Sequence, residues 1–394
     1  MLRRCLFWCH LSCGVSVGLV VLMMSVTGVI LTYERQLLAR ADQAYFYYPD
    51  PGSQRLAIAA LIEQAEKIPN FTPDSITLFA NAAAPVELRA GRRDSRYLNP
   101  YTGEPYPQRS TALDGFFNQV TQWHRWFALS GEQRQWGRML TGIANLGFLF
   151  LVISGLYLWL PRAWQWAVLK KRLWFTRNPN AAARDFNWHH VLGLWAAVPL
   201  IVIVSTATVF HYTWANNLVY TLAGEEPPQR GGRNSQLDRP APNPRQNLNN
   251  KNYETYIATV RQTKPDWQAI TFSLNDTDQI SIAIDSGNGG QPQKRDSLIV
   301  DAATGKVIQH LPFSSQSAGR QARSWVRFLH TGEALGVGGQ TIAGLASLAA
   351  VIMVWTGLAL AWRRLQRHLR KRRQIKPAEK SLGSMPSHSS LESN

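Results

Sequence analysis

The feature that most constrains the chain is an uncharged run of 20 residues, Val191–Phe210, with histidine at both ends. A run of this length can cross the hydrocarbon core of a membrane as a helix. His189 and His190 precede it and His211 follows it. A straight helix would place His189 and His211 roughly 40° apart on one face and roughly 33 Å apart along the axis. Since ionisable groups at membrane depth usually serve transport, proton transfer or a cofactor, the run predicts a functional membrane span.

Hydropathy predicts that this run is one of several spans. The predicted spans are approximately Leu11–Tyr33, Ile143–Leu160, Val191–Phe210 and Thr341–Trp362. Four spans place both chain ends on the same side of the membrane. We therefore predict an α-helical membrane protein built on a bundle of four transmembrane helices.

The net charge of +17 is unevenly distributed along the chain. Segments 1–10, 161–190 and 363–394 hold 17 basic and 3 acidic residues, whereas the two long loops hold 25 basic and 22 acidic residues. The positive-inside rule therefore places the short basic segments in the cytoplasm and the long loops outside. Topology accounts for the charge, so we predict membrane lipid and no nucleic acid as a partner.

The spans show an internal duplication. Aligning His10 with His189 pairs Gly14 with Gly193, Thr27 with Thr206, and Tyr33 with Tyr212. In the second and fourth spans, Ser154-Gly155-Leu156 likewise aligns with Thr356-Gly357-Leu358. The pattern predicts a tandem repeat of span, exported unit and span.

Each long loop has the pattern of a small α+β unit. The first shows a helix at Leu56–Ile68 and strands at Ser75–Phe79 and Val86–Arg89. The second shows a helix at Tyr253–Gln262 and strands at Ala269–Leu274, Gln279–Asp285 and Leu298–Val300. Between the third span and the second unit, Glu225–Asn250 is rich in Pro, Asn, Arg and Gly, which predicts a flexible excursion that contacts substrate.

These patterns divide the chain into eight segments. They are transmembrane helix 1 (1–33), a first periplasmic unit (34–118), an interfacial helix with transmembrane helix 2 (119–160), a cytoplasmic loop (161–186), transmembrane helix 3 (187–213), a second periplasmic unit (214–324), transmembrane helix 4 with the segment before it (325–362), and a basic cytoplasmic tail (363–394).

Topology sorts the histidines into two depths. His10 and His189 lie near the cytoplasmic face, and His124, His211 and His330 lie near the outer face. Two imidazoles at one depth on different helices can bind a haem iron from both sides, so the pattern predicts two b-type haems. A zinc or copper site would need further ligands at that depth, and a proton relay would usually include intramembrane carboxylates, which the span cores lack.

Two choices among these ligands remain open. His190 is an alternative to His189, although the alignment with His10 favours His189. Symmetry nominates His124 with His330 at the outer haem, and His211 is an alternative to either. Arg125 and Arg327 lie close in sequence to His124 and His330, and they are either partners for the haem propionates or ordinary interface arginines.

The motifs around these histidines resemble one known family. They are His10-x-x-x-Gly14 with Val26-Thr27-Gly28, Trp123-His124-Arg125-Trp126, Trp188-His189-His190-Val191-Leu192-Gly193, and Leu329-His330-Thr331-Gly332-Glu333-Ala334-Leu335-Gly336. Over almost the whole chain they resemble the PepSY-associated transmembrane family, which includes ferric-siderophore reductases of the FoxB type. The resemblance implies a four-helix bundle of the bacterial inner membrane, exported PepSY-like domains, and electron transfer through histidine-bound haem to ferric siderophore in the periplasm.

The electron donor is not encoded in this chain. Its cytoplasmic segments are too short for a flavin or nicotinamide domain, so a quinol or a separate cytoplasmic reductase is expected to supply electrons. Three other functions fit the same sequence. They are a cytochrome b subunit for another redox partner, a PepSY-type protein that regulates a protease or binds a partner without redox activity, and a transporter of iron or of the chelate.

Overall fold

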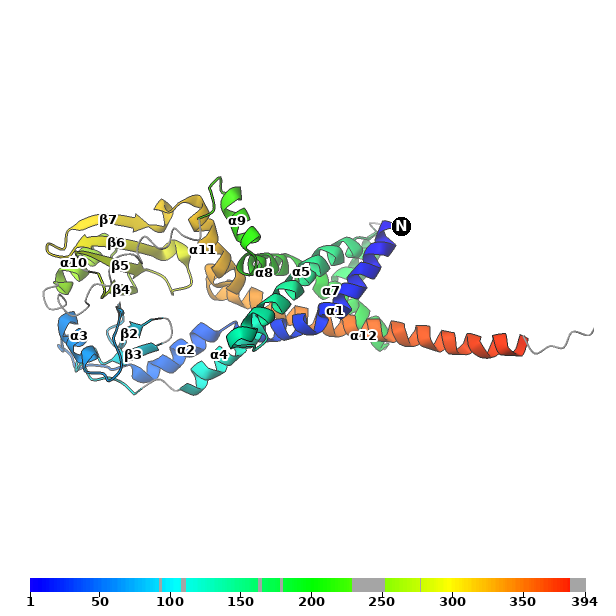
Figure 1. Cartoon of the computed structure of the whole chain (residues 1–394), viewed down its shortest axis with the longest axis horizontal. Coiled ribbons are helices and arrows are strands. Elements are labelled where there is room, and N and C mark those ends of the chain that lie inside the picture. The colour runs from blue at the N-terminus through cyan, green and yellow to red at the C-terminus, as the bar shows by residue number, and fades with distance from the viewer. Residues whose placement is uncertain are drawn as a thin grey trace, which may run out of the picture. The chain divides into compact units, whose positions relative to one another are not determined.

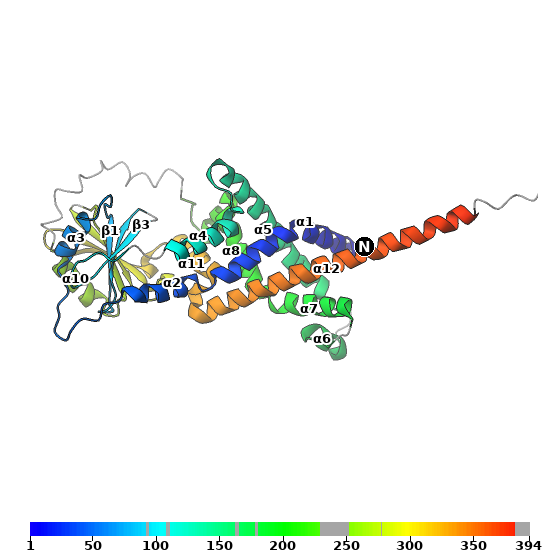
Figure 2. The same ribbon diagram turned by 90° about the horizontal axis from the view of Figure 1, so that it is seen from below.

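The computed structural model describes residues 1–91, 94–107, 111–161, 165–177, 180–228, 252–276 and 278–382. The chain forms two compact units (Figures 1 and 2). The first comprises Met1–Val26, Met139–Ile201 and Leu345–Asn394, and the second comprises Thr27–Arg138 and Val202–Gly344. Each unit is therefore assembled from segments that are far apart in the sequence.

Long apolar helices make up most of the first unit. Its helices, some of which continue beyond it, are α1 (Leu2–Leu31), α5 (Arg134–Trp159), α6 (Trp166–Leu173), α7 (Ala181–Trp195), α8 (Ala197–His211) and α12 (Gly336–Leu382). In the described part of the chain, three helical stretches are long and apolar enough to cross a membrane: Leu2–Tyr45, Gly131–Trp159 and Glu333–Arg370. The first, second and fourth predicted spans are thus confirmed as membrane-spanning in length and composition. Helices suit these runs because a backbone in lipid must satisfy its own hydrogen bonds.

The third predicted span is not a straight helix. It is divided at Ala196 into α7 and α8, which are bent by 67° relative to each other. Pro199 lies three residues after the break, and it has no N–H to donate to the Trp195 carbonyl of a continuous helix. The expectation that His189 and His211 share one face roughly 33 Å apart was therefore wrong. The two helices count as a fourth span only if the bent pair crosses the membrane as one element.

The second unit contains a set of shorter helices. They are α2 (Glu34–Asp42), α3 (Ile58–Glu66), α4 (Thr111–Trp126), α9 (Thr213–Leu222), α10 (Tyr253–Thr263) and α11 (Ala318–Thr331). Short 3₁₀ turns are η1 (Gln43–Tyr45), η2 (Gly131–Gln133), η4 (Pro292–Lys294), η5 (Phe313–Ser315) and η6 (Glu333–Leu335). Of the predicted excursion Glu225–Asn250, residues 229–250 lie outside the described residues.

The two long loops share one antiparallel sheet instead of forming two separate sheets. Its seven strands are β1 (Ser75–Phe79), β2 (Val86–Ala90), β3 (Asp94–Leu98), β4 (Ala269–Ser273), β5 (Gln279–Asp285), β6 (Arg295–Asp301) and β7 (Val307–Pro312), in the order β3-β2-β1-β4-β5-β6-β7. Strands β1 and β4 join the halves, with Ser75 opposite Ser273 and Phe79 opposite Ala269. The two predicted α+β units are therefore parts of a single folded domain.

The core of this domain lies between the sheet and two helices, α3 and α10 (Figure 1). Alternate strand residues such as Ile76, Ile270 and Ile282 are fully buried against the helices. The residues between them are mainly small and polar, as in the hydroxyl pair of Thr77 and Thr271 at 2.9 Å. This alternation is typical of a sheet with one face on a core and the other face open.

Candidate functional site

The inner histidines each contact the partner span through Nδ1. His10 of α1 lies 2.8 Å from the hydroxyl of Ser154 in α5. His189 of α7 lies 3.0 Å from the carbonyl oxygen of Met353 and 3.2 Å from the hydroxyl of Thr356, both in α12. The two histidines are also near enough to interact electrostatically. The structure therefore places His10 and His189 within electrostatic reach of each other.

The contacts of His189 determine its tautomer. A carbonyl oxygen only accepts hydrogen bonds, so Nδ1 of His189 must donate to Met353. The Thr356 hydroxyl donates to the carbonyl of Ile352 at 2.8 Å, and it is left to act as an acceptor toward His189. Nε2 of His189 therefore carries the lone pair that a metal ion requires.

His190 is arranged differently from its neighbour. Its Nδ1 donates to the Phe186 carbonyl of its own helix at 2.8 Å, and its ring centroid lies 4.0 Å from that of Phe186. His189 is instead bonded to another span, as His10 is. The contacts favour His189 as the ligand and leave His190 as a neighbour of the site.

The outer histidines repeat the inner arrangement. Nδ1 of His124 in α4 lies 2.9 Å from the hydroxyl of Thr27. Nδ1 of His330 in α11 lies 2.9 Å from the Ile203 carbonyl and 3.2 Å from the hydroxyl of Thr206. By the same reasoning, Nδ1 of His330 donates and Nε2 carries the lone pair. Burial of the His330 ring lowers its pKa, which favours the neutral, ligating form.

The rings of His124 and His330 are 6.4 Å apart between centroids, with their planes inclined by 60°. Two imidazoles on opposite sides of one metal ion would have centroids about 6 Å apart, given metal–nitrogen bonds of about 2 Å. The observed separation therefore fits a shared iron.

His211 lies close to this pair without joining it. It ends α8, its Nδ1 is buried, and among the described residues that atom has no hydrogen-bond partner. The ring of the preceding residue, Phe210, packs edge-on against His330 with centroids 5.4 Å apart. His211 thus stays an alternative outer ligand.

Two tight corners hold the outer histidine helices against the spans. Between α4 and α5, Phe127 and Ala128 adopt positive φ, and a Cβ at Gly137 would lie 1.9 Å from the Trp126 carbonyl oxygen. Between α11 and α12, Gly332 has a φ of +74°, and a Cβ at Gly339 would lie 2.3 Å from the Gly332 carbonyl oxygen. Only glycine permits these close approaches, so both corners are fixed by sequence.

Arg125 and Arg138 lie within electrostatic reach of the outer histidines. Arg125 interacts electrostatically with Arg134, Arg138 and Arg327. Both Arg125 and Arg134 lie over the Trp126 ring, at 5.0 and 3.6 Å from its centroid. No carboxylate within the described ranges forms an ion pair with Arg134 or Arg327. The group presents several positive charges at one place, which suits an anionic ligand.

The donor set of both sites consists of paired histidines. Within the described residues, no three His, Cys, Asp or Glu side chains are grouped so that they would hold a bare metal ion. Two neutral imidazoles with their Nδ1 atoms engaged are a donor set that a haem iron uses. The separation of His124 and His330 therefore fits one haem, and the Nδ1 contacts of His10 and His189 are compatible with a second.

The hydroxyl partners of the four histidines were missed as site residues in the sequence. They are Thr27, Ser154, Thr206 and Thr356. A signal for them existed, because the alignment of the spans pairs Thr27 with Thr206 and Ser154 with Thr356. What the sequence alone lacked was the packing that sets each hydroxyl beside a ring.

The long apolar helices, the bent helix pair and the antiparallel sheet together define a multi-pass membrane protein with a mixed α/β domain. The family model of the PepSY-associated TM region matches residues 7–364. The chain therefore belongs to this family, as its motifs indicated. A comparison with curated proteins finds no match.

Proposed function

We propose that this protein is a haem-b oxidoreductase of the bacterial inner membrane that passes electrons to ferric siderophore in the periplasm. The observation that carries the proposal is the pair His124 and His330, whose ring centroids are 6.4 Å apart. Both rings have Nδ1 engaged by hydroxyls, and His330 also donates to a carbonyl. These contacts support the proposal that His124 and His330 would hold one haem iron.

A second haem would be held by His10 and His189. Support comes from the matching contacts of these rings with Ser154 and Thr356, which occupy corresponding positions in the sequence. The recurrence of the same contact in both halves also supports the tandem repeat inferred from the alignment. Sites near both membrane faces would let electrons cross the membrane without a mobile carrier.

When bound, haem supplies one-electron transfer, and the chain's own residues supply the setting for it. The histidines hold the iron, and the partner hydroxyls and carbonyls orient the rings. Arg125 and Arg327 are proposed partners for the haem propionates, and the neighbouring Arg134 and Arg138 extend the positive charge. The same charge would attract an anionic chelate to the outer face.

Reduction at the outer face would release the metal from its chelate. Siderophores bind ferric iron through hard oxygen donors, and ferrous iron is held less tightly by such ligands. A quinol or a separate cytoplasmic reductase would supply the electrons.

The test begins with the visible spectrum of the purified protein, oxidised and then reduced with dithionite. Bis-histidine haem should give sharp bands on reduction, at a stoichiometry of two per chain. The reduced protein, freed of excess reductant without oxygen, should then be mixed with ferric siderophores and a ferrous-specific chromophore. Haem reoxidation should accompany formation of the ferrous chelate, and His124→Ala or His330→Ala should slow both.

Two outcomes would overturn the proposal. A protein that purifies colourless after expression with sufficient haem would instead be a PepSY-type binding or protease-regulating protein. Reduced haems that ignore every ferric chelate and are oxidised by quinone would make the protein a cytochrome b subunit for another redox partner.

A further inference from the structure

The two inner histidines are not held equally, although their hydroxyl partners occupy corresponding positions in the repeat. His189 has two acceptors for its Nδ1, the Met353 carbonyl and the Thr356 hydroxyl. In the part of the chain that the structure describes, the ring of His10 has a single hydrogen-bond partner, Ser154. Ser154 and Thr356 are both buried, at 3% and 2% exposure, so water does not readily replace either hydroxyl.

The Met353 carbonyl distinguishes the two rings, because it gives His189 a second hydrogen-bond acceptor. Without the Thr356 hydroxyl, Nδ1 of His189 would still donate to Met353 at 3.0 Å, and the ring would keep its tautomer. The Ser154 hydroxyl donates to the Leu151 carbonyl at 3.4 Å, so it accepts from Nδ1 of His10, and without it Nδ1 would lose its partner. The His10 ring would then be free to rotate and to exchange its proton between the two nitrogens.

A glycine of the partner helix lies beside the Cε1 edge of each ring. A Cβ at Gly155 would lie 3.4 Å from Cε1 of His10, and one at Gly357 would lie 3.2 Å from Cε1 of His189. The edges of both rings therefore pack against glycine, which leaves room but offers no hydrogen bond. The hydrogen bond with the Ser154 hydroxyl therefore sets the orientation of the His10 ring.

We propose that Ser154 is the positioning residue of the inner site, which fixes the tautomer and orientation of His10, whereas Thr356 is backed up by the Met353 carbonyl. This inference rests on the proposed function, since it concerns the inner haem. It predicts that two hydroxyls in equivalent positions have unequal importance. Removing the partner of a ligating histidine typically lowers metal affinity about 10–100-fold.

The test compares Ser154→Ala with Thr356→Val in the full-length protein. Three readouts serve: haem per chain, the midpoint potential of the inner haem in a spectroelectrochemical titration, and its low-spin electron paramagnetic resonance signal. Ser154→Ala should weaken retention of the inner haem about tenfold or more, raise the potential of what remains, and broaden its low-spin signal. Thr356→Val should change each of these less.

A conservative variant and an internal control make the comparison specific. Ser154→Thr keeps a hydroxyl and should restore the retention, potential and signal of the wild-type protein. The outer haem should be unchanged in all three variants, which verifies that each has folded. An unchanged inner haem in Ser154→Ala, or an effect of Thr356→Val as large as that of Ser154→Ala, would overturn this inference alone. A wild-type protein that binds no haem would overturn the proposed function instead.

Discussion

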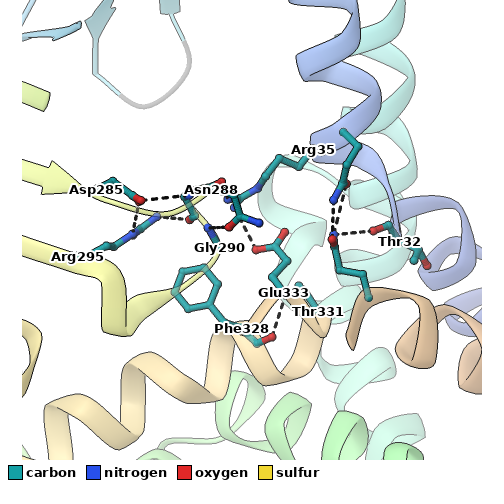
Figure 3. Close-up of polar contacts among 12 residues, drawn as sticks. Thr32, Arg35, Asp285, Asn288, Gly290, Arg295, Phe328, Thr331 and Glu333 are labelled. Carbon is teal, nitrogen blue, oxygen red and sulfur yellow. Dashed lines mark hydrogen bonds and ion pairs between the residues drawn. The ribbon is translucent and has the colours of Figure 1, made fainter. Parts of the chain in front are cut away.

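The guanidinium of Arg35 lies 3.0 Å from the carboxylate of Glu333, three residues after the outer ligand candidate His330 (Figure 3). The loop between β5 and β6 packs onto this ion pair. Arg35 donates to the Asn288 carbonyl at 2.9 Å, and a Cβ at Gly290 would lie 3.0 Å from Glu333. The ion pair thus ties the sheet to the corner that carries His330.

Glu333→Gln tests how far that corner depends on the ion pair. The side chain of Glu333 is 14% exposed and that of Arg35 is 35% exposed, so removing the negative charge leaves a partly buried cation without its partner. We expect the variant to lose about 1–3 kcal/mol of folding free energy and to bind the outer haem less tightly. Thermal unfolding and haem quantification measure the two effects.

The matched control for this variant is Glu63→Gln. Glu63 and Lys67 form an exposed pair at 3.4 Å on one helix, with side chains 68% and 59% exposed. Loss of this ion pair should lower the free energy of unfolding by no more than about 0.5 kcal/mol. Equal costs for the two variants would contradict the assigned role of Glu333.

Two adjacent glycines of α12 should respond in opposite ways to alanine. A Cβ at Gly339 would overlap the Gly332 carbonyl oxygen, whereas a Cβ at Gly338 meets nothing within 4 Å. Gly339→Ala should therefore destabilise the protein by about 1–3 kcal/mol, displace His330 and lower the outer haem content. Gly338→Ala should be neutral or stabilising by up to about 1 kcal/mol, because alanine favours the helix. The melting temperatures of the two variants test this prediction. An unchanged melting temperature in Gly339→Ala would contradict the close approach of Gly339 to the Gly332 carbonyl.

His189 and His190 provide a further matched pair. His189 is bonded to Met353 and Thr356 of another helix, whereas His190 is bonded to Phe186 of its own. We expect His189→Ala to remove one haem of two and His190→Ala to retain both. Pyridine haemochrome quantification counts them. Retention of both haems in His189→Ala together with loss of one in His190→Ala would reverse the assignment.

Glu225 should make the stability of the N-terminal end of α11 depend on pH in the acid range. Its carboxylate accepts hydrogen bonds from the Gly319 backbone N–H at 2.9 Å and the Ser317 hydroxyl at 2.8 Å, and these bonds lower its pKa. A carboxyl whose pKa is lower in the folded state stabilises that state above its unfolded pKa, and the contribution is lost as the pH falls through the folded value. Melting temperature should therefore decline below about pH 4.5 more steeply in the wild-type protein than in Glu225→Gln.

The control is Glu226→Gln, which removes the neighbouring exposed carboxylate and leaves the hydrogen bonds of Glu225 to α11 in place. Parallel curves for the wild-type protein and Glu225→Gln would show that this carboxylate does not cap α11.

Several elements were predictable because their pattern is local. The strand Gln279–Asp285 alternates buried and exposed residues along its whole length, and its bounds agree with β5. The spans are set by long uncharged runs that only a helix can carry through lipid. In contrast, β7 (Val307–Pro312) lies at the sheet edge with mostly exposed residues, so it has no alternation to detect. The break at Ala196 was signalled by Pro199, but the bend of 67° depends on packing.

The residues of the candidate site likewise divide into those with a local sequence signal and those without one. Histidines at matching positions follow from the repeat, so the sequence alone could nominate His10, His124, His189 and His330 as candidates. Their hydroxyl and carbonyl partners lie up to 167 residues away in sequence, as for His189 and Thr356, so no local pattern connects them. The joining of two loops into one sheet is likewise a long-range contact that periodicity cannot report.

The pairing of β1 with β4 sets an order for assembly. Five residue pairs join strands that lie nearly 200 positions apart, from Ser75 with Ser273 to Phe79 with Ala269. During synthesis, the edge of β1 that pairs with β4 stays without its partner strand until two further apolar segments have been made. A chain truncated before β4 would therefore expose that edge, and it would be prone to pair with other chains and to need a chaperone. The two halves of the sheet are consequently one folding unit, and a protein that contains only one of them should aggregate.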